Sequence, residues 1–333
     1  LSGVILVAMI VSLVPATAGA AIAQEPATVD SDFRSRLVNP EVIQLGYGGT
    51  TSKLRAGQDY IIRLPAGVKT GYTELNGGRH ILIDGGTIVM DGSSPSHLER
   101  RAIYIKNATG TVRIQNVNIA GSHSAAEFDA VAISAPEAVV ELVNLTVQNL
   151  HGSYAGFHGD IVQPFGGVKK LVINGLTGRT SYQGFYLAQT NGTIGSVELR
   201  NVSLSYHPNP NQYSSVLLWF DSCSTYPVTL ENVFIQPRSG QTMRASVRPD
   251  ESGCKPIDSG STLSWPAGST ISGVIQRGTA ANVPELPDLP EIADTGPSQV
   301  RLKAPKQARA GARVKLTAQV NDPDGVADVA FAV

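Results

Sequence analysis

The feature that most constrains the fold is a repeated bend signal, an Asn or Gly between two short runs of aliphatic residues. Neighbouring signals are 31, 28, 31, 26 and 31 residues apart. A repeat of roughly 20–50 residues is typical of solenoids, in which each repeat forms one coil that packs only against its neighbours. Gly and Asn enter the left-handed backbone region most readily, so each signal predicts a tight bend between two strands. The bend residues are Gly85, Asn116, Asn144, Gly175, Asn201 and Asn232.

A second set of short apolar runs repeats in phase with the bends. Three of its members, Ile103, Val131 and Val162, each lie 14 residues before the residue that follows the next bend. The same spacing lengthens to 17 at Phe185 and to 16 at Leu217. Because two registers agree, we predict a parallel β-solenoid. A β-sandwich would instead separate its strands by hairpin turns every 8–12 residues or so, roughly.

These repeats resemble those of the right-handed parallel β-helix, or pectin-lyase-like, family of secreted proteins, over roughly residues 60–278. The resemblance implies an all-β fold with three strands in each coil: one before the bend, one after it and one from the second set. It also implies an N-terminal cap, which residues 42–64 would supply, because an exposed terminal coil offers unpaired strand edges. Asparagines at stacked bends can hydrogen-bond along the axis. We therefore interpret the pairs Asn116–Asn144 and Asn201–Asn232 as structural.

The first 23 residues are predicted to be a targeting signal and not part of the fold. An apolar run too short for a membrane span is followed by Ala-Ile-Ala at residues 21–23. This is the pattern of a secretory signal peptide (residues 1–23) whose basic beginning is missing. No apolar stretch reaches the roughly 18 residues of a membrane helix, so we expect a secreted or cell-surface protein without a membrane span. An oxidising compartment permits a disulfide between Cys223 and Cys254, with two unpaired cysteines as the alternative.

The composition changes on both sides of the solenoid, which defines the expected domains. Residues 24–59 would form the N-terminal segment and cap, and residues 60–278 the β-helix. Four prolines mark residues 279–298 as a semi-rigid linker. Residues 299–333 resemble the first part of a bacterial immunoglobulin-like repeat. They are too few for a whole domain of that kind, which needs about 100 residues, so a truncated β-domain is expected.

The charge balance excludes a nucleic-acid binder. Only 16% of the residues are charged, and 26 Lys and Arg against 27 Asp and Glu give a net charge of −1. Nucleic-acid-binding proteins normally show a basic excess gathered on one face. A solenoid of short apolar strands with Gly, Asn, Ser and Thr bends needs few charged side chains, which accounts for the low charge. We expect a monomer whose partner is an extracellular polysaccharide.

Five of the six histidines lie in the long loops of the predicted solenoid. In the resembling family, the loops that lead from the strand after the bend into the second strand set border a groove. Binding and catalytic residues concentrate on loops that a rigid scaffold holds. The alternative is that loops simply collect polar residues. The matching loops here are residues 90–101, 120–129, 148–160, 178–183 and 205–215, and the histidines are His97, His123, His151, His158 and His207.

Two aspartates occupy the same position in successive coils, because Asp129 and Asp160 each precede an aligned valine by two residues. Stacked strands lie about 4.8 Å apart, which would bring the carboxyls together and raise one pKa. A glycoside hydrolase needs such a pair, one protonated acid and one ionised base or nucleophile. We therefore favour a glycoside hydrolase with Asp129, Asp160 and His158 as catalytic residues. The alternative is structural, since Arg101 holds the same position one coil earlier and can form a stacked ion pair with Asp129.

Further side chains of the same loops and strands are expected to bind the sugar. Trp219 shares the strand parity of Leu217, so it is expected in the core instead. The expected substrate contacts are His123, His151, Tyr154, Gln163, Arg179, Tyr182, Gln183, Tyr206 and His207.

Two other functions stay open. The resemblance includes polysaccharide lyases, which remove the proton next to a uronate carboxyl, often with calcium on that carboxyl. The sequence has no dense carboxylate cluster of the kind that supplies the about 6–8 oxygens of a calcium site. A non-catalytic glycan-binding adhesin also fits, because immunoglobulin-like repeats serve as spacers on cell-surface proteins. We expect no metal site and no cofactor, with calcium as the exception for a lyase.

Overall fold

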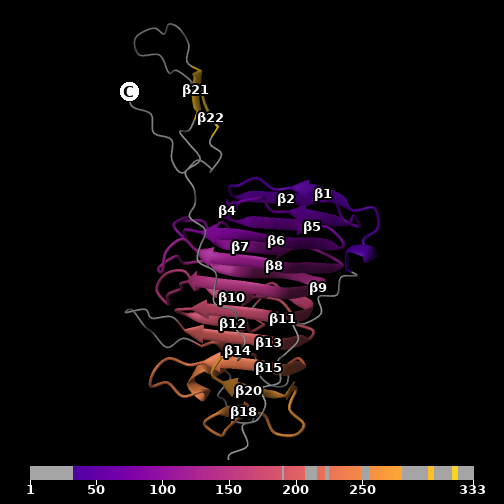
Figure 1. Ribbon diagram of the computed structural model, residues 1–333. Helices are drawn as coiled ribbons and strands as arrows, with labels where there is room; N and C mark the ends of the chain where they lie inside the picture. The colour runs from indigo at the N-terminus through magenta and orange to yellow at the C-terminus, as the bar shows by residue number, and fades with distance from the viewer. Residues whose placement is uncertain are drawn as a thin grey trace, which may run out of the picture.

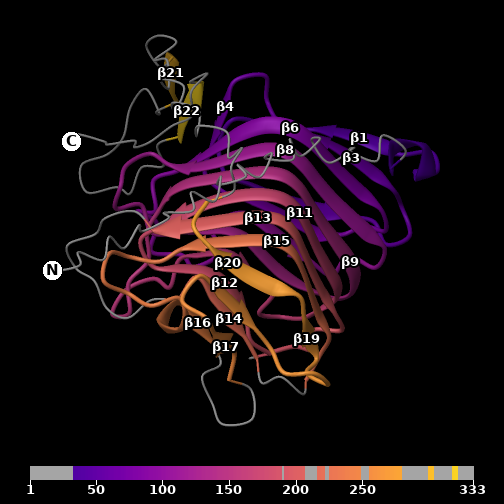
Figure 2. The same cartoon turned by 60° about the horizontal axis from the view of Figure 1, so that its bottom comes forward.

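The protein is an all-β solenoid of about six turns. Figure 1 shows its strands stacked like rungs from β1 to β15, and Figure 2 looks at the same stack after a 60° turn. The architecture comes from a computed structural model. The predicted signal peptide, His207 and both cysteines lie outside the described residues. These residues are 33–189, 191–206, 216–221, 225–248 and 255–279, with the strand backbone at 299–303 and 317–321.

One face of the solenoid, called sheet I here, is a parallel sheet that contains the second set of apolar runs. Val131 pairs with Ile103 on one side and with Val162 on the other. Val162 pairs in turn with Phe185, so the predicted register is confirmed over four coils. The strands of sheet I are β2 (Thr50–Leu54), β5 (Thr73–Gly77), β7 (Arg101–Lys106), the start of β9 (Asp129–Leu150), β10 (Asp160–Gln163), β12 (Gln183–Leu187), β14 (Leu218–Phe220) and β16 (Val247–Arg248).

The strands on either side of each bend form the second parallel sheet, sheet II. Leu142 pairs with Ile114 and with Ile173, and all three side chains are fully buried. Stacks of this kind run along the axis and form the core between the sheets. The strands of sheet II are β1 (Glu41–Gln44), β3 (Tyr60–Arg63), β4 (Val68–Thr70), β6 (Ile81–Met90), β8 (Thr111–Gly121), the rest of β9, β11 (Val168–Thr180), β13 (Val197–Tyr206), β15 (Val228–Gln236), β19 (Ile271–Ser272) and β20 (Val274–Arg277).

The ends of the solenoid differ from its middle. The 3-10 helix η1 (Phe33–Arg36) buries Phe33, whose ring centre lies 4.8 Å from the Arg113 guanidinium. At the other end, β17 (Ile257–Asp258) and β18 (Thr262–Ser264) pair antiparallel, and β18 pairs antiparallel with β20. This change of direction covers the last coil, whose edge would otherwise be unpaired. A second 3-10 helix, η2 (Arg244–Ser246), leads into β16. No helix in the described part of the chain is long and apolar enough to cross a membrane.

The segment expected to begin an immunoglobulin-like domain contains one described strand pair. Strands β21 (Gln299–Lys303) and β22 (Thr317–Asn321) pair antiparallel. The remainder of that expected domain lies outside the described residues, so the domain stays a prediction.

The bend residues take the left-handed conformation that the sequence predicts. All six have positive φ, from 52° to 80°. The Asn144 Nδ2 group donates a hydrogen bond to Asn116 Oδ1 over 3.3 Å, and Asn232 Nδ2 donates to Asn201 Oδ1 over 3.2 Å. Both predicted asparagine pairs along the axis are therefore confirmed.

Replacing Asn144 by alanine is expected to lower the free energy of unfolding by about 1–2 kcal/mol, because an alanine strains the left-handed backbone. The Asn144→Gly variant loses the same side-chain hydrogen bonds but keeps a relaxed backbone, so it should be more stable than the alanine variant. Urea denaturation of both variants and the parent measures the difference. Equal stability of the two variants would contradict the backbone argument.

The predicted register is wrong by one residue at β14. Phe185 pairs with Leu218 and not with Leu217, while Tyr186 pairs with Trp219. Both leucines are fully buried, so this apolar run contains no alternation from which the register could be read. As a consequence Trp219 does not lie in the core as predicted. Its side chain is only partly buried and borders the groove described next.

Candidate functional site

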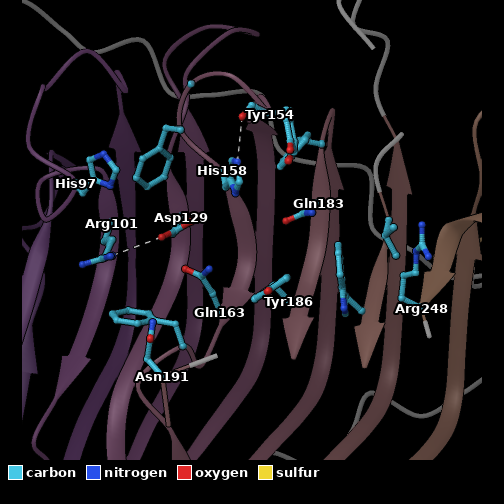
Figure 3. A pocket seen from close by; sticks show the side chains of 16 residues that line it. His97, Arg101, Asp129, Tyr154, His158, Gln163, Gln183, Tyr186, Asn191 and Arg248 are labelled. Atoms are coloured by element: carbon cyan, nitrogen blue, oxygen red, sulfur yellow. Dashed lines mark hydrogen bonds and ion pairs between the residues drawn. The ribbon is translucent and has the colours of Figure 1, made fainter. Parts of the chain in front are cut away.

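A groove of about 700 Å³ lies on the outer side of sheet I (Figure 3). Four of its side chains come from successive strands: Gln163 on β10, Tyr186 on β12, Trp219 on β14 and Arg248 on β16. Tyr186 pairs with Trp219, and Trp219 pairs with Arg248. The loop at residues 152–158, between β9 and β10, adds further side chains. The groove therefore crosses several coils and follows the solenoid axis.

The structure brings several predicted site residues together in this groove. Figure 3 shows Asp129 between Arg101 and His158, with Gln163 and Gln183 on the neighbouring strands. All of them come from the loops or strands of sheet I that the sequence indicated. The predicted residues that line the groove are Asp129, Tyr154, His158, Gln163, Tyr182 and Gln183.

Three predicted substrate contacts are not among the residues that line the groove. His123 is exposed in the loop at 120–129, and Arg179 is exposed on β11 of sheet II. Tyr206 ends β13 of sheet II, with its ring centre 4.4 Å from the Arg238 guanidinium. Each belongs to a predicted loop, but its local path directs it away from sheet I.

Two further predicted residues, Asp160 and His151, also do not line the groove. Asp160 is completely buried. His151 is largely buried, where its Nδ1 contacts the Ser181 hydroxyl and its Nε2 lies 4.0 Å from Glu127 Oε1. Neither side chain is therefore placed to contact a ligand bound in the groove.

The two aspartates of the predicted pair are neighbours in the fold. The Asp160 N–H donates a hydrogen bond to Asp129 Oδ1 over 3.0 Å, and Arg101 Nε lies 3.5 Å from Asp129 Oδ2. The carboxyl oxygens of Asp160 are buried and have no hydrogen-bond partner. The ion pair between Arg101 and Asp129 that the sequence offered as the structural alternative is thus present.

Burial controls the protonation of this pair. Burial raises the pKa of Asp129 to about 7, although the Asp160 amide and the Arg101 guanidinium oppose the rise. Burial and the neighbouring Asp129 charge raise the pKa of Asp160 well above its ordinary value. Two adjacent buried carboxyls cannot both ionise cheaply. The pair therefore carries no more than one negative charge near neutral pH, and Arg101 faces that charge.

Arg101 is held rigidly at the edge of the groove. Its guanidinium lies between the rings of Tyr104 and Phe165, at 4.8 Å and 4.6 Å from the ring centres. These two rings also stack on each other, with their centres 5.8 Å apart. Because Asp129 faces the Nε atom, the terminal guanidinium nitrogens are the ones that can reach a ligand.

His158 is the basic side chain nearest the aromatic wall of the groove. Its ring stacks on Tyr154 at 5.9 Å and is tilted against Tyr182 at 5.7 Å. Its Nε2 atom lies 3.2 Å from the Tyr154 carbonyl oxygen. A carbonyl only accepts hydrogen bonds, so Nε2 carries the hydrogen and Nδ1 is the basic nitrogen of the neutral ring. Burial raises the pKa of Tyr182 to about 12, and its hydroxyl therefore stays protonated.

Glu127 fixes the loop that carries His158, and sequence reasoning missed it. The Glu127 carboxylate accepts hydrogen bonds from Ser153 Oγ at 2.7 Å and from the Phe157 N–H at 3.2 Å. Arg100 Nη1 also donates to it, over 3.1 Å. Burial alone would raise the pKa of Glu127, but these donors and the nearby cations lower it. One ionised carboxylate thus joins both ends of the loop at 152–158 to the scaffold.

Replacing Glu127 by alanine is expected to loosen that loop. The change leaves the Phe157 amide and the Arg100 guanidinium without this acceptor, at a cost of about 1.5–3 kcal/mol for a hydrogen bond to a charged group. Hydrogen exchange of the amides at 152–158 should accelerate. The Glu137→Ala variant, which changes an exposed residue of β9, serves as the control. Unchanged exchange in the Glu127 variant would contradict this role.

The comparisons with known proteins leave the groove to be interpreted from its own chemistry. No family model, no curated protein and no solved structure matches the chain. Among the residues that the structure describes, no group of three or more His, Cys, Asp or Glu side chains is placed to hold a metal ion. The predicted resemblance to pectin-lyase-like proteins and to an immunoglobulin-like repeat stays a prediction.

Proposed function

We propose that the protein binds an extracellular polysaccharide that contains uronate residues along this groove and cleaves it by β-elimination. The observation that carries the proposal is the charge of the described groove residues. Two arginines and two histidines face one carboxyl, Asp129, which Arg101 already neutralises. A cationic groove with several aromatic rings suits an acidic sugar chain. The extracellular setting rests on the predicted signal peptide.

β-Elimination requires a cation at the uronate carboxylate, a base for the adjacent C–H group and an acid for the leaving oxygen. We assign these roles to Arg101, to His158 Nδ1 and to the Tyr182 hydroxyl. The base takes the proton, and the electron pair of the C–H bond forms a carbon–carbon double bond. The C–O bond to the leaving sugar then breaks, and its oxygen takes the proton of Tyr182. Both rings line the same part of the groove, which supports their joint action.

The elimination accounts for the groove better than hydrolysis by the aspartate pair. A glycoside hydrolase places two carboxyl groups on the scissile bond, about 5–5.5 Å apart for retention and about 6.5–9.5 Å for inversion. Here only Asp129 lines the groove, while Asp160 is completely buried beneath it. A buried second carboxyl has no access to a sugar.

Hydrolysis is nevertheless the second candidate, because one observation favours it. The pKa values of both aspartates are raised, Asp129 to about 7, which is the range in which a carboxyl can serve as a general acid. A loop movement that uncovered Asp160 would complete the pair. The predicted adhesin, which binds a glycan and leaves it intact, is the third outcome that an experiment must separate.

The test is a product assay on uronate homopolymers, with neutral glucans as controls. Elimination creates an unsaturated uronate, so ultraviolet absorbance and reducing ends should rise together, and only with the uronate polymers. The assay is run with and without a calcium chelator, because a lyase can depend on calcium. New reducing ends without absorbance would instead establish hydrolysis. Binding without either product would establish the adhesin, and no binding to any polysaccharide would overturn the proposal.

A further inference from the structure

Three outward side chains continue the groove beyond the residues assigned to cleavage. Tyr186, Trp219 and Arg248 stand on β12, β14 and β16 and pair across neighbouring strands. Their chain neighbours Phe185, Leu218 and Val247 are buried in the core. Since successive side chains of a strand point to opposite faces, the three lie together on the outer face of sheet I. Figure 3 places Tyr186 near the middle of the view and Arg248 at the end opposite His97.

The contacts among these three side chains form a platform with a cation at one end. The Trp219 ring meets the Tyr186 ring edge to face, with ring centres 5.1 Å apart and planes at 62°. The Arg248 guanidinium lies 5.9 Å from the centre of the Trp219 ring. All three line the groove and are only partly buried, so each leaves surface for a ligand.

Packing of the core does not explain this indole. The core of the last coils has its own tryptophan, Trp265, whose ring meets Phe220 at 5.9 Å. Trp219 instead lies at an outward strand position inside the groove. Large aromatic side chains with one open face are the usual anchors of binding sites.

We infer that Tyr186, Trp219 and Arg248 form a separate subsite for one uronate residue of the chain, and this rests on the proposed function. The aromatic rings contact the C–H face of the sugar, and the Arg248 guanidinium pairs with its carboxylate. Parallel strands are about 4.8 Å apart, so β14 lies about 10 Å along the axis from β10, the strand of Gln163. A sugar at this subsite is therefore a different residue of the polymer from the one that His158 acts on.

This position has a consequence that can be measured. Only an oligomer long enough to reach from His158 to Trp219 can use the subsite. Loss of the indole should weaken the binding of long oligouronates about tenfold or more, as expected for a tryptophan anchor, and leave the shortest ones unaffected. Loss of the Arg248 charge should weaken the preference for oligouronates over neutral oligomers of the same length.

The experiment uses the full chain with His158→Ala, so that the ligand is not cleaved during titration. Size-defined oligouronates are titrated by calorimetry and by tryptophan fluorescence, in this background and with Trp219→Ala or Arg248→Gln added. Tyr47→Ala, which removes an exposed aromatic ring outside the groove, is the matched control. Circular dichroism checks the fold, and Trp219→Phe, which keeps a ring, should restore most of the affinity.

The outcomes separate the subsite from the proposed function. A length-dependent loss in Trp219→Ala, with partial rescue by phenylalanine and no effect in the Tyr47 control, supports the subsite. Equal affinity of the parent background and Trp219→Ala for every length overturns it and leaves the proposed function standing. Absence of binding to any oligouronate in the parent background overturns the proposed function, and the subsite with it.

Discussion

Replacing His158 by alanine is expected to slow cleavage of a uronate polymer by about 10²–10⁴-fold, the usual contribution of a positioned general base. The imidazole is the only basic side chain that stacks on the aromatic wall beside Tyr182 among the described groove residues. Initial rates of unsaturated product measure the loss. Affinity for the polymer should change little, since the aromatic and arginine side chains remain.

His123→Ala is the matched control for that variant. This histidine is exposed in a neighbouring loop and does not line the groove. Its removal should leave the rate unchanged. Parent-like cleavage by the His158 variant, on any polymer that the parent cleaves, would show that another group takes the proton.

Replacing Asp160 by asparagine is expected to stabilise the protein at neutral pH by roughly 2 kcal/mol, the size of the penalty for a buried unpartnered polar group that ionises in the unfolded chain. The carboxyl of Asp160 is fully buried and has no hydrogen-bond partner. Urea denaturation of the parent and the variant, at mildly acidic and at alkaline pH, measures the effect.

The pH dependence follows from the direction of both shifts. In the unfolded chain an aspartate releases its proton near pH 4, about its ordinary pKa. In the folded chain burial raises the pKa of Asp129 to about 7 and that of Asp160 well above its ordinary value. The folded state therefore binds more protons in this window, so stability falls as the pH rises from about 4 through 7. Asp160→Asn should flatten that fall, whereas exposed Asp258→Asn should reproduce the parent curve.

The same variant decides between the two cleavage chemistries. Elimination by His158 does not use the Asp160 carboxyl, so Asp160→Asn should retain most of its activity. Loss of turnover in a well-folded Asp160 variant would favour hydrolysis by the aspartate pair.

The sequence predicts the solenoid because its signals repeat. A left-handed bend tolerates few residue types, so Asn116 and Asn144 mark equivalent positions without any further information. The register of sheet I is equally clear where apolar and polar residues alternate, as around Val131 and Val162. It fails at Leu217, where neighbouring leucines are both buried and only the path of the chain decides which one pairs with Phe185.

The site is harder to predict because burial depends on the loops. The equivalence of Asp129 and Asp160 is visible in the sequence, but the depth of Asp160 is not. It depends on how closely the loop returns over it: a Cβ atom on Gly159 would lie 2.1 Å from the His151 carbonyl oxygen. Glu127 did leave a signal, because it stands two residues before Asp129, where His158 stands before Asp160. A carboxylate that ties a loop and an imidazole that faces the groove share one coil position.

The parallel pairing of sheet I makes the protein a ruler with fixed divisions. Each coil advances by one strand spacing and contributes one outward residue to the row Gln163, Tyr186, Trp219 and Arg248. Inserting or deleting one whole coil would therefore lengthen or shorten the ruler by one division, without disturbing the stacking of the coils on either side. The polymer length that such a protein measures is set by how many coils it has, and the sugar accepted at each division by a single outward side chain.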